Sequence, residues 1–177
     1  GFLGQATCLA FLQDGGFRVR GTIRDAQRPA MIESLRKTLG ADNFARLEIV
    51  EADILDATSV SRAVQGSTFV VHTASPFTRA EPEDEQELIR PAVEGSLNVL
   101  RACKAHKVQR CAVTSSATSV RYCRPEDRPS DNVFTPEHWS DPTLGKEVLN
   151  TYQKSKTLAE KAVWDFQASL DESERFE

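Results

Sequence analysis

The chain has 177 residues, which is enough for one hydrophobic core and hardly enough for two. Hydrophobic residues make up 40% and charged residues 27%, which is typical of a globular domain and not of a disordered or membrane-spanning chain. The net charge of −4 provides no basic surface, and no apolar run approaches the ~20 residues of a spanning helix, so we expect neither a nucleic-acid nor a membrane partner.

Helical and strand-like patterns alternate along the first part of the chain. A helical pattern follows residues 1–4 and stops at the turn residues 14–16. The segments that come next are a strand at 17–23, a helix at 29–40 that begins with Pro29, a strand at 47–50, a short helix at 59–65 and a buried strand at 69–74.

The second part of the chain continues the alternation. The acidic segment 81–87 predicts the first turn of a helix, since carboxylates are favourable at a helix N-terminus; the alternatives are a metal site or a basic partner. Pro91 either kinks this helix or begins a second one that runs to His106. A strand at 108–116, a loop-rich stretch at 117–146 and a long helix at 151–169 follow.

Strands that alternate with helices predict parallel β-α-β units with right-handed crossovers. The expected fold is therefore an α/β doubly wound parallel sheet of the Rossmann type, with residues 1–177 forming a single domain. Ligands of such sheets bind at the carboxyl ends of the strands. Candidate site residues should therefore lie just after the predicted strands.

Cysteines and histidines are scattered along the chain. The four cysteines contain no C-x-x-C pair, and the three histidines lie far apart in the sequence. We therefore expect a reduced, cytoplasmic protein that binds no metal.

Tyr152 and Lys156 lie four residues apart in the last predicted helix, so their side chains share one helix face. A neighbouring ammonium favours the phenolate form of a tyrosine and thereby makes an acid–base group at neutral pH. The same spacing also arises by chance, where a lysine extends beside a half-buried aromatic ring.

Glycines and arginines in the first part of the chain suggest a dinucleotide site. Gly1 and Gly4 have the spacing of the end of a G-x-x-G-x-x-G turn, in which a helix N-terminus presents free N–H groups to a pyrophosphate. Arg24 follows the strand at 17–23, where an arginine accommodates the 2′-phosphate of NADP, and Arg28 can assist it. The plain alternative is a solvated arginine at a strand end.

Polar residues follow the next three predicted strands as well. Asp53 can accept a hydrogen bond from an adenine amino group, and the small residues at 73–75 allow a cofactor to lie close to the backbone. The hydroxyl groups at 114–116 can donate a hydrogen bond to a substrate carbonyl. These residues are expected at one edge of the sheet.

The order and spacing of these segments resemble the extended short-chain dehydrogenase/reductase family. Within the family, the chain is most similar to the branch of dihydroflavonol reductase, cinnamoyl-CoA reductase and the fungal aldehyde/ketone reductases. The resemblance covers nearly all 177 residues and is carried by GFLG, GTIRD, EADILD, VVHTASPF, PAVEGSLNVLRAC, AVTSSA and YQKSKTLAEKAVW.

The resemblance implies an NADP-dependent oxidoreductase that reduces an aldehyde or ketone to an alcohol with NADPH. Hydride passes to the carbonyl carbon while Tyr152 protonates the oxygen, Ser116 steadies the developing alkoxide and Lys156 holds the nicotinamide ribose. The implied cofactor contacts are Gly1, Phe2, Gly4, Arg24, Asp53, Ile54, Thr73, Ala74, Ser75, Tyr152 and Lys156.

The family pattern extends past both ends of the sequence. A central strand precedes Gly1 in the family, and a sixth strand and a substrate domain follow the Tyr-Lys helix. We therefore expect residues 1–177 to be an NADP-binding Rossmann domain truncated at both ends, with open inner strand edges and no activity of its own. Arg121 stands where dihydroflavonol reductases carry an asparagine that contacts the flavonoid, so the resemblance does not extend to that contact.

Two other functions share much of this pattern. A nucleotide-sugar epimerase or dehydratase of the same superfamily keeps the tyrosine and lysine but retains tightly bound NAD, and Arg24 argues against it. A non-catalytic NADP-binding regulatory protein needs the fold without the chemistry, and the intact set of Ser116, Tyr152 and Lys156 argues against that function.

Overall fold

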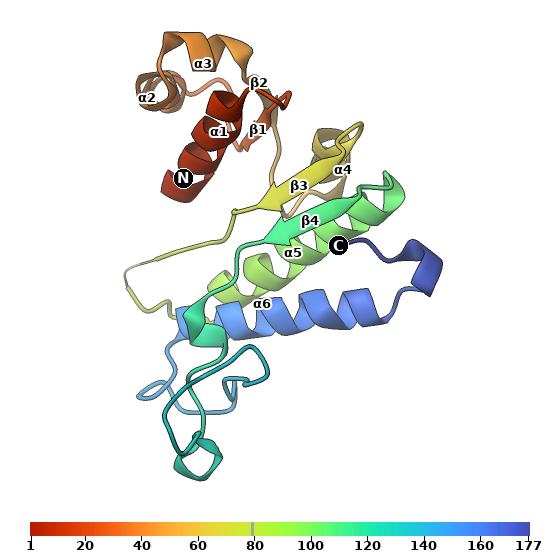
Figure 1. The fold of residues 1–177 in the computed structure, drawn as a ribbon. Helices are drawn as coiled ribbons and strands as arrows, with labels where there is room; N and C mark the ends of the chain where they lie inside the picture. Colours follow the sequence, from red (N-terminus) through yellow and green to blue (C-terminus); the bar gives the residue numbers. More distant parts are fainter. Residues whose placement is uncertain (79) are drawn as a thin grey trace.

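The computed structural model describes residues 1–78 and 80–177. The strands in these residues form two separate parallel sheets of two strands each (Figure 1). The first sheet pairs β1 (Arg20–Ile23) with β2 (Glu48–Glu51), and the second pairs β3 (Phe69–His72) with β4 (Arg110–Val113). Helices connect the strands of each parallel pair, which confirms the predicted α/β class.

Most helices match the predicted ones. They are α1 (Phe2–Asp14), α2 (Pro29–Leu39), α4 (Ala57–Val64), α5 (Gln86–Ala105) and α6 (Thr151–Ala168). The short helix α3 (Ala41–Arg46), which the sequence pattern did not predict, follows α2 directly after Gly40. Gly40 has a φ of 77°, a conformation that glycine adopts without steric cost, and it lets the chain turn between the two helices.

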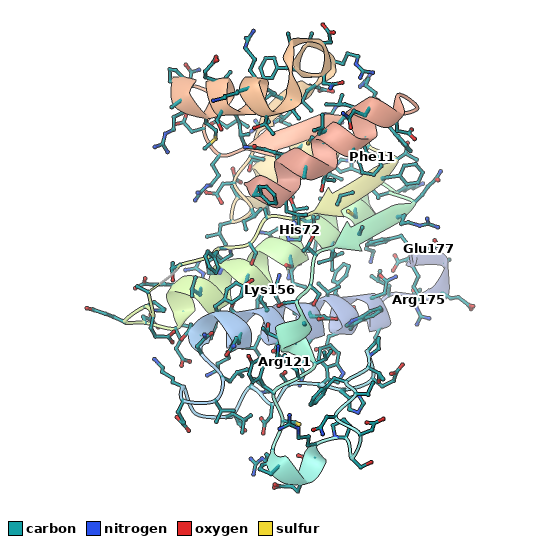
Figure 2. All side chains as sticks on the ribbon, turned by 60° about the vertical axis from the view of Figure 1, so that its left-hand side comes forward. Phe11, His72, Arg121, Lys156, Arg175 and Glu177 are labelled. Carbon is teal, nitrogen blue, oxygen red and sulfur yellow. The ribbon has the colours of Figure 1, made fainter. Side chains whose placement is uncertain are left out.

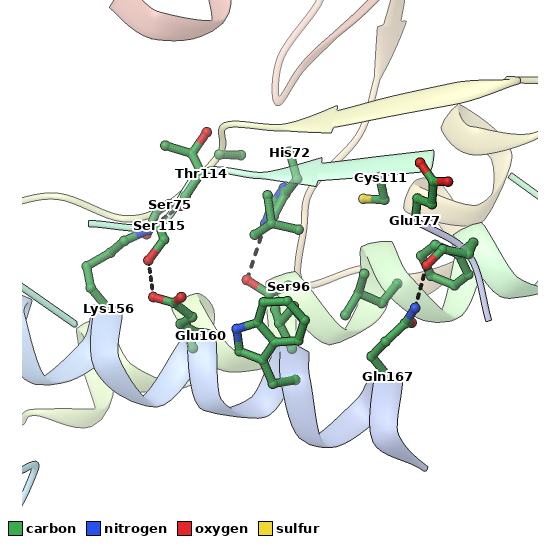
Figure 3. Close-up of a pocket in the computed structure, with 17 residues that line it drawn as sticks. His72, Ser75, Ser96, Cys111, Thr114, Ser115, Lys156, Glu160, Gln167 and Glu177 are labelled. Carbon is green, nitrogen blue, oxygen red and sulfur yellow. Dashed lines mark hydrogen bonds between the residues drawn. The ribbon is translucent and has the colours of Figure 1, made fainter. Parts of the chain in front are cut away.

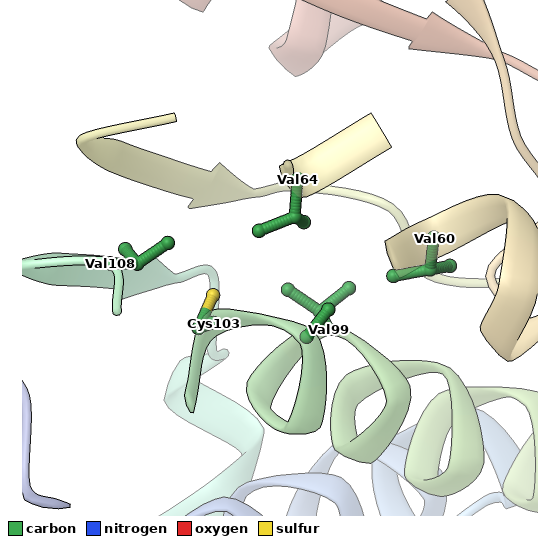
Figure 4. Packing of buried hydrophobic residues seen from close by; sticks show 6 residues of the cluster. Val60, Val64, Val99, Cys103 and Val108 are labelled. Atoms are coloured by element: carbon green, nitrogen blue, oxygen red, sulfur yellow. The ribbon is translucent and has the colours of Figure 1, made fainter. Parts of the chain in front are cut away.

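Each two-stranded sheet has its own hydrophobic core. The core of the first sheet contains Leu12 from α1, Leu35 and Leu39 from α2, and Leu47 just before β2. The second core joins α4 and α5 to the sheet and is built from Val60, Val64, Val99, Ala102, Cys103 and Val108 (Figure 4). Helices α5 and α6 lie side by side on one face of the β3–β4 sheet (Figure 1).

The inner edges of the two sheets are open, as predicted. Among the described residues, no backbone ladder joins β1 to β3. The prediction that the strand at 69–74 is buried is wrong for one face, because Phe69 and Val71 are 50% and 40% exposed. Side chains alternate along a strand, so His72 points toward the helices and is buried while Phe69 and Val71 lie on the face that the described residues leave largely uncovered.

Several predicted boundaries shift. The strand predicted at 17–23 begins only at Arg20, and the ring of Phe17 instead packs edge-on against Phe11, with 5.0 Å between centroids. Pro91 does not begin a new helix, since α5 is continuous across it. The strands predicted at 69–74 and 108–116 end at His72 and Val113, so the polar residues of both segments lie just past the strand ends.

The chain end lies beside β4. The backbone N–H of Glu177 donates to the carbonyl of Gln109 at 3.2 Å, and the N–H of Cys111 donates to the carbonyl of Glu177. These two bonds have the hydrogen-bond pattern of a parallel pair. The chain therefore reaches the next strand position on the outer edge of β4, one step further than the sequence predicted.

No helix in residues 1–78 or 80–177 has the length and apolar character needed to cross a membrane.

Candidate active site

Helix α6 begins at Thr151 because a reciprocal cap fixes its start. The side chain of Asn150 accepts a hydrogen bond of 2.9 Å from the N–H of Gln153, and the side chain of Gln153 accepts one of 2.8 Å from the N–H of Asn150. The cap sets the register of the helix. Tyr152 and Lys156 therefore lie in its first two turns, on one face.

The acidic segment 81–87 contacts α6 as well as α5. The carboxylate of Glu81 accepts hydrogen bonds from the N–H and the hydroxyl of Thr151, and Glu85 pairs with Lys154 at 2.7 Å. Lys154 holds the pKa of Glu85 below its ordinary value through this hydrogen bond. The prediction that these acids lie at the N-terminus of their own helix is wrong for Glu81, which binds α6, whereas Glu85 directly precedes α5, which begins at Gln86.

Lys156 joins α6 to the end of β4. Its side chain is buried and extends from α6 toward the end of β4 (Figures 2 and 3). Its Nζ donates a hydrogen bond of 2.8 Å to the carbonyl oxygen of Thr114. Desolvation lowers the pKa of the Lys156 ammonium, and the negative charge of Glu160 partly opposes that shift. This contact brings the predicted lysine to the serine-rich end of the strand.

Ser116 follows Thr114 closely in the sequence, and Tyr152 precedes Lys156 by one helical turn, so both lie near this contact in the sequence. The half-buried ring of Tyr152 packs edge-on against Phe77, with 5.2 Å between centroids and an angle of 90°. The Oγ of Ser116 accepts hydrogen bonds from the N–H of Thr118 at 3.2 Å and from its hydroxyl at 2.9 Å. Within the described residues, Ser116 and Tyr152 form no hydrogen bond with each other.

A cavity of about 300 Å³ lies between the ends of β3 and β4 and the helices α5 and α6 (Figure 3). From the predicted site it takes in Ala74, Ser75 and Lys156, but neither Ser116 nor Tyr152. Its other polar lining residues are His72, Ser96, Thr114, Ser115, Glu160, Gln167 and Glu177.

His72 is a buried member of this cavity that the sequence pattern did not assign to the site. Burial, together with the charge of Lys156, lowers the pKa of His72 to about 4. The hydroxyl of Ser96 donates to the carbonyl of Ala92 at 2.8 Å and therefore accepts from the Nε2 of His72 at 3.3 Å. The imidazole is thus neutral at physiological pH, with its proton on Nε2.

The N-terminus of α1 lies against the segment that follows β3. Gly1 precedes the helix and provides no side-chain cap, and Phe2 is 90% exposed. A Cβ atom on Gly4 would lie 3.1 Å from the Oγ1 of Thr73, so the absence of a side chain at Gly4 permits this close approach. The structure therefore brings Gly4, in the first turn of α1, close to Thr73, whereas Phe2 is exposed.

Arg24 and Asp53 follow β1 and β2, at the same ends of the strands. Arg24 is exposed, and within the described residues no carboxylate lies at ion-pair distance from it. A carboxylate oxygen of Asp53 accepts a hydrogen bond of 2.9 Å from the N–H of Leu55. The side chain of Ile54 packs on α5, where a Cβ atom on Gly95 would come within 2.6 Å of it, so Ile54 turns its side chain to the protein core.

Two carboxylates that the sequence did not assign to the site touch it, namely Glu81 and Glu160. The spacing of Glu160, four residues after Lys156, was a usable signal for a shared helix face. Glu81 is 70 residues from its partner Thr151, and no local pattern predicts that contact. No cluster of three or more metal-binding side chains occurs in the part of the chain that the structure describes.

Comparison with known sequences identifies a family and several relatives. The model of the 3-beta hydroxysteroid dehydrogenase/isomerase family matches residues 1–173. Barley dihydroflavonol 4-reductase is 39% identical over 173 residues, which are 94% of this chain and 46% of the relative. Tetraketide alpha-pyrone reductase 1 of Arabidopsis thaliana is 38% identical over 85% of this chain and 45% of the relative. The chain thus spans slightly less than half the length of these curated relatives.

Solved structures show the same fold. The NADPH complex of Gre2 from Candida albicans has a TM-score of 0.74 and 27% identity, over 97% of this chain and 52% of that protein. Vestitone reductase from alfalfa has a TM-score of 0.69 and 30% identity, over 92% of this chain and 48% of that protein.

Proposed function

Because the chain belongs to the 3-beta hydroxysteroid dehydrogenase/isomerase family, among extended short-chain reductases such as dihydroflavonol reductase, we propose that its full-length protein reduces a carbonyl compound with NADPH. Residues 1–177 form the cofactor-binding domain in this proposal, and the catalytic residues are Ser116, Tyr152 and Lys156. The substrate is an aldehyde or ketone, and the product is the alcohol.

The observation that carries the proposal is the hydrogen bond from Lys156 to the carbonyl of Thr114. It ties the helix that bears Tyr152 to the strand end that bears Ser116, although the segment between Thr114 and Lys156 is mostly loop. A reductase of this kind needs a hydroxyl donor, a phenol and an ammonium held around one carbonyl group. A buried ammonium also stabilises phenolate more strongly than a solvated one does, because the local dielectric is low.

The residues at the strand ends fit a dinucleotide. The first turn of α1 has free N–H groups and no capping side chain, which suits a pyrophosphate. The Oγ of Ser75 is buried and has no hydrogen-bond partner among the described residues, so a polar group of a ligand would satisfy it. Arg24, which is exposed directly after β1, would pair with the 2′-phosphate in this proposal.

The chemistry follows from the three catalytic side chains. NADPH, when bound, supplies the hydride. Tyr152 gives its proton to the carbonyl oxygen, and Lys156 would hold the nicotinamide ribose. Ser116 accepts hydrogen bonds from Thr118, so its own hydroxyl proton is free to be donated to the developing alkoxide.

The proposal is tested with the full-length protein, NADPH and a panel of aldehydes and ketones. We expect NADPH consumption with at least one carbonyl, matched by formation of the alcohol. Lys156→Ala should weaken NADPH binding and lower kcat, whereas Lys161→Ala, a change on the same helix, should do neither. Interconversion of a substrate without net NADPH consumption would contradict the proposal and favour an epimerase.

A further inference from the structure

Ser115 and Glu160 form a second link between β4 and α6. The hydroxyl of Ser115 donates a hydrogen bond to a carboxylate oxygen of Glu160 (Figure 3). Glu160 lies one helical turn beyond Lys156, so the two links from α6 engage consecutive residues of the strand end, Thr114 and Ser115. Two adjacent anchors fix both the position and the rotation of an extended segment, which one anchor alone cannot do.

The backbone at the strand end converts this anchor into an orientation for Ser116. Ser116 has φ and ψ angles of −151° and 145°, which is extended backbone. Successive side chains of an extended chain point to opposite sides. Because Ser115 is held by Glu160, the side to which Ser116 points is fixed as well, and a shift of Ser115 would rotate both hydroxyl groups.

The charge of Glu160 also acts on Lys156. The two side chains share the cavity but form no ion pair within the described residues, so the interaction is a through-space attraction. The other titratable groups that line the cavity are the neutral His72 on β3, Cys111 on β4 and Glu177 at the chain end; α5 contributes only Ser96 and Leu100 to it. Glu160 is the group whose charge raises the pKa of Lys156 against the effect of burial.

We propose that Glu160 is a positioning residue, which holds Ser115 so that Ser116 is oriented and whose carboxylate, one helical turn from Lys156 and in the same cavity, attracts the ammonium of Lys156. The role in reduction rests on the proposed function. The effect of Glu160 on Lys156 does not rest on the proposed function, because it concerns the protonation of a side chain in the protein without substrate.

The experiment uses the full-length protein and four variants. Glu160→Gln keeps an acceptor for Ser115 but removes the charge, Glu160→Ala removes both, and Ser115→Ala removes only the hydrogen bond. Asp165→Asn, on the exposed face of the same helix, is the matched control. Two quantities are measured: the pH dependence of Lys156 acetylation by acetic anhydride, followed by mass spectrometry, and the pH profiles of kcat and KM.

In Glu160→Gln we expect Lys156 to become reactive at lower pH than in the wild type, and the alkaline limb of the kcat profile to move in the same direction. Ser115→Ala should lower kcat by about tenfold with KM nearly unchanged, because the loss affects a group that acts in the transition state. Glu160→Ala should show both effects, and Asp165→Asn neither.

The proposal is overturned if Lys156 reacts at the same pH in Glu160→Gln as in the wild type, or if Ser115→Ala keeps the wild-type kcat. A wild-type protein that consumes no NADPH with any carbonyl would overturn the proposed function and the role in reduction. A shifted Lys156 reactivity in Glu160→Gln would in that case still support the coupling between the two side chains.

Discussion

The carboxylate of Glu81 accepts hydrogen bonds from both the backbone N–H and the hydroxyl of Thr151, the first residue of α6. Thr151 is fully buried and immediately precedes Tyr152. One side chain from the segment after β3 therefore caps the helix that carries the phenol. A carboxylate at this position also interacts favourably with the helix dipole.

We predict that Glu81→Ala lowers the stability of the full-length protein by about 1 kcal/mol, because it leaves a buried N–H and a buried hydroxyl without their acceptor. Glu81→Gln should cost less, since an amide oxygen can still accept. Thermal unfolding of both variants measures the effect, with the exposed Glu83→Ala as control. Equal melting temperatures for Glu81→Ala and Glu83→Ala would show that the contact does not stabilise α6.

The second prediction concerns His72 and acid. The pKa of His72 is about 4 in the folded protein and near ~6.5 in an unfolded chain, so the unfolded state binds more protons between these values. Stability should therefore fall as the pH drops from about 6.5 to about 4, by roughly 3 kcal/mol at most from this group. Denaturant unfolding at several pH values should show a smaller loss in His72→Asn than in the wild type or in His106→Asn. Identical pH dependences in all three proteins would contradict the assignment.

The alternation of strands and helices was predictable because each element buries its own apolar face. Leu35 and Leu39 of α2 lie in one core with helical spacing in the sequence, and Val99 and Cys103 of α5 do so in the other. The helix α3 was not predictable from hydrophobic periodicity, since none of its six residues is buried.

The site was predictable in part. Lys156 could be assigned because its spacing from Tyr152 is local, and its contact with Thr114 then follows from the fold. Glu81 could not be assigned, because the acid binds a helix 70 residues away and carboxylates before a helix usually serve that helix. Local patterns contain no information on such long-range partners.

Cofactor selectivity depends on Arg24 in this account. We predict that Arg24→Asp shifts the ratio of kcat/KM for NADPH over NADH by at least about tenfold toward NADH, because the change removes a partner of the 2′-phosphate and adds a repelling charge. The control is Arg90→Asp, an equal change of charge at an exposed position of α5. The NADP assignment fails if the two variants have the same selectivity.

Residues 1–177 expressed alone are predicted to melt without a sharp cooperative transition and to lack NADPH-dependent reduction. The two sheets share no ladder in the described residues, a two-stranded sheet is marginally stable, and exposed Phe69 and Val71 favour aggregation. Near-ultraviolet circular dichroism during heating measures whether the tertiary packing is lost in a sharp cooperative transition. A monomer with a sharp melt and a measurable NADPH affinity would contradict the prediction.

The central claim is that Tyr152 is the proton donor of a carbonyl reduction, and the most direct measurement compares Tyr152→Phe with the wild-type full-length protein. NADPH affinity is measured by fluorescence titration, and turnover is measured with a carbonyl that the wild type reduces. We predict that NADPH affinity stays within about twofold while kcat falls by at least ~100-fold, the contribution of a positioned acid. Turnover of Tyr152→Phe near the wild-type value would contradict it.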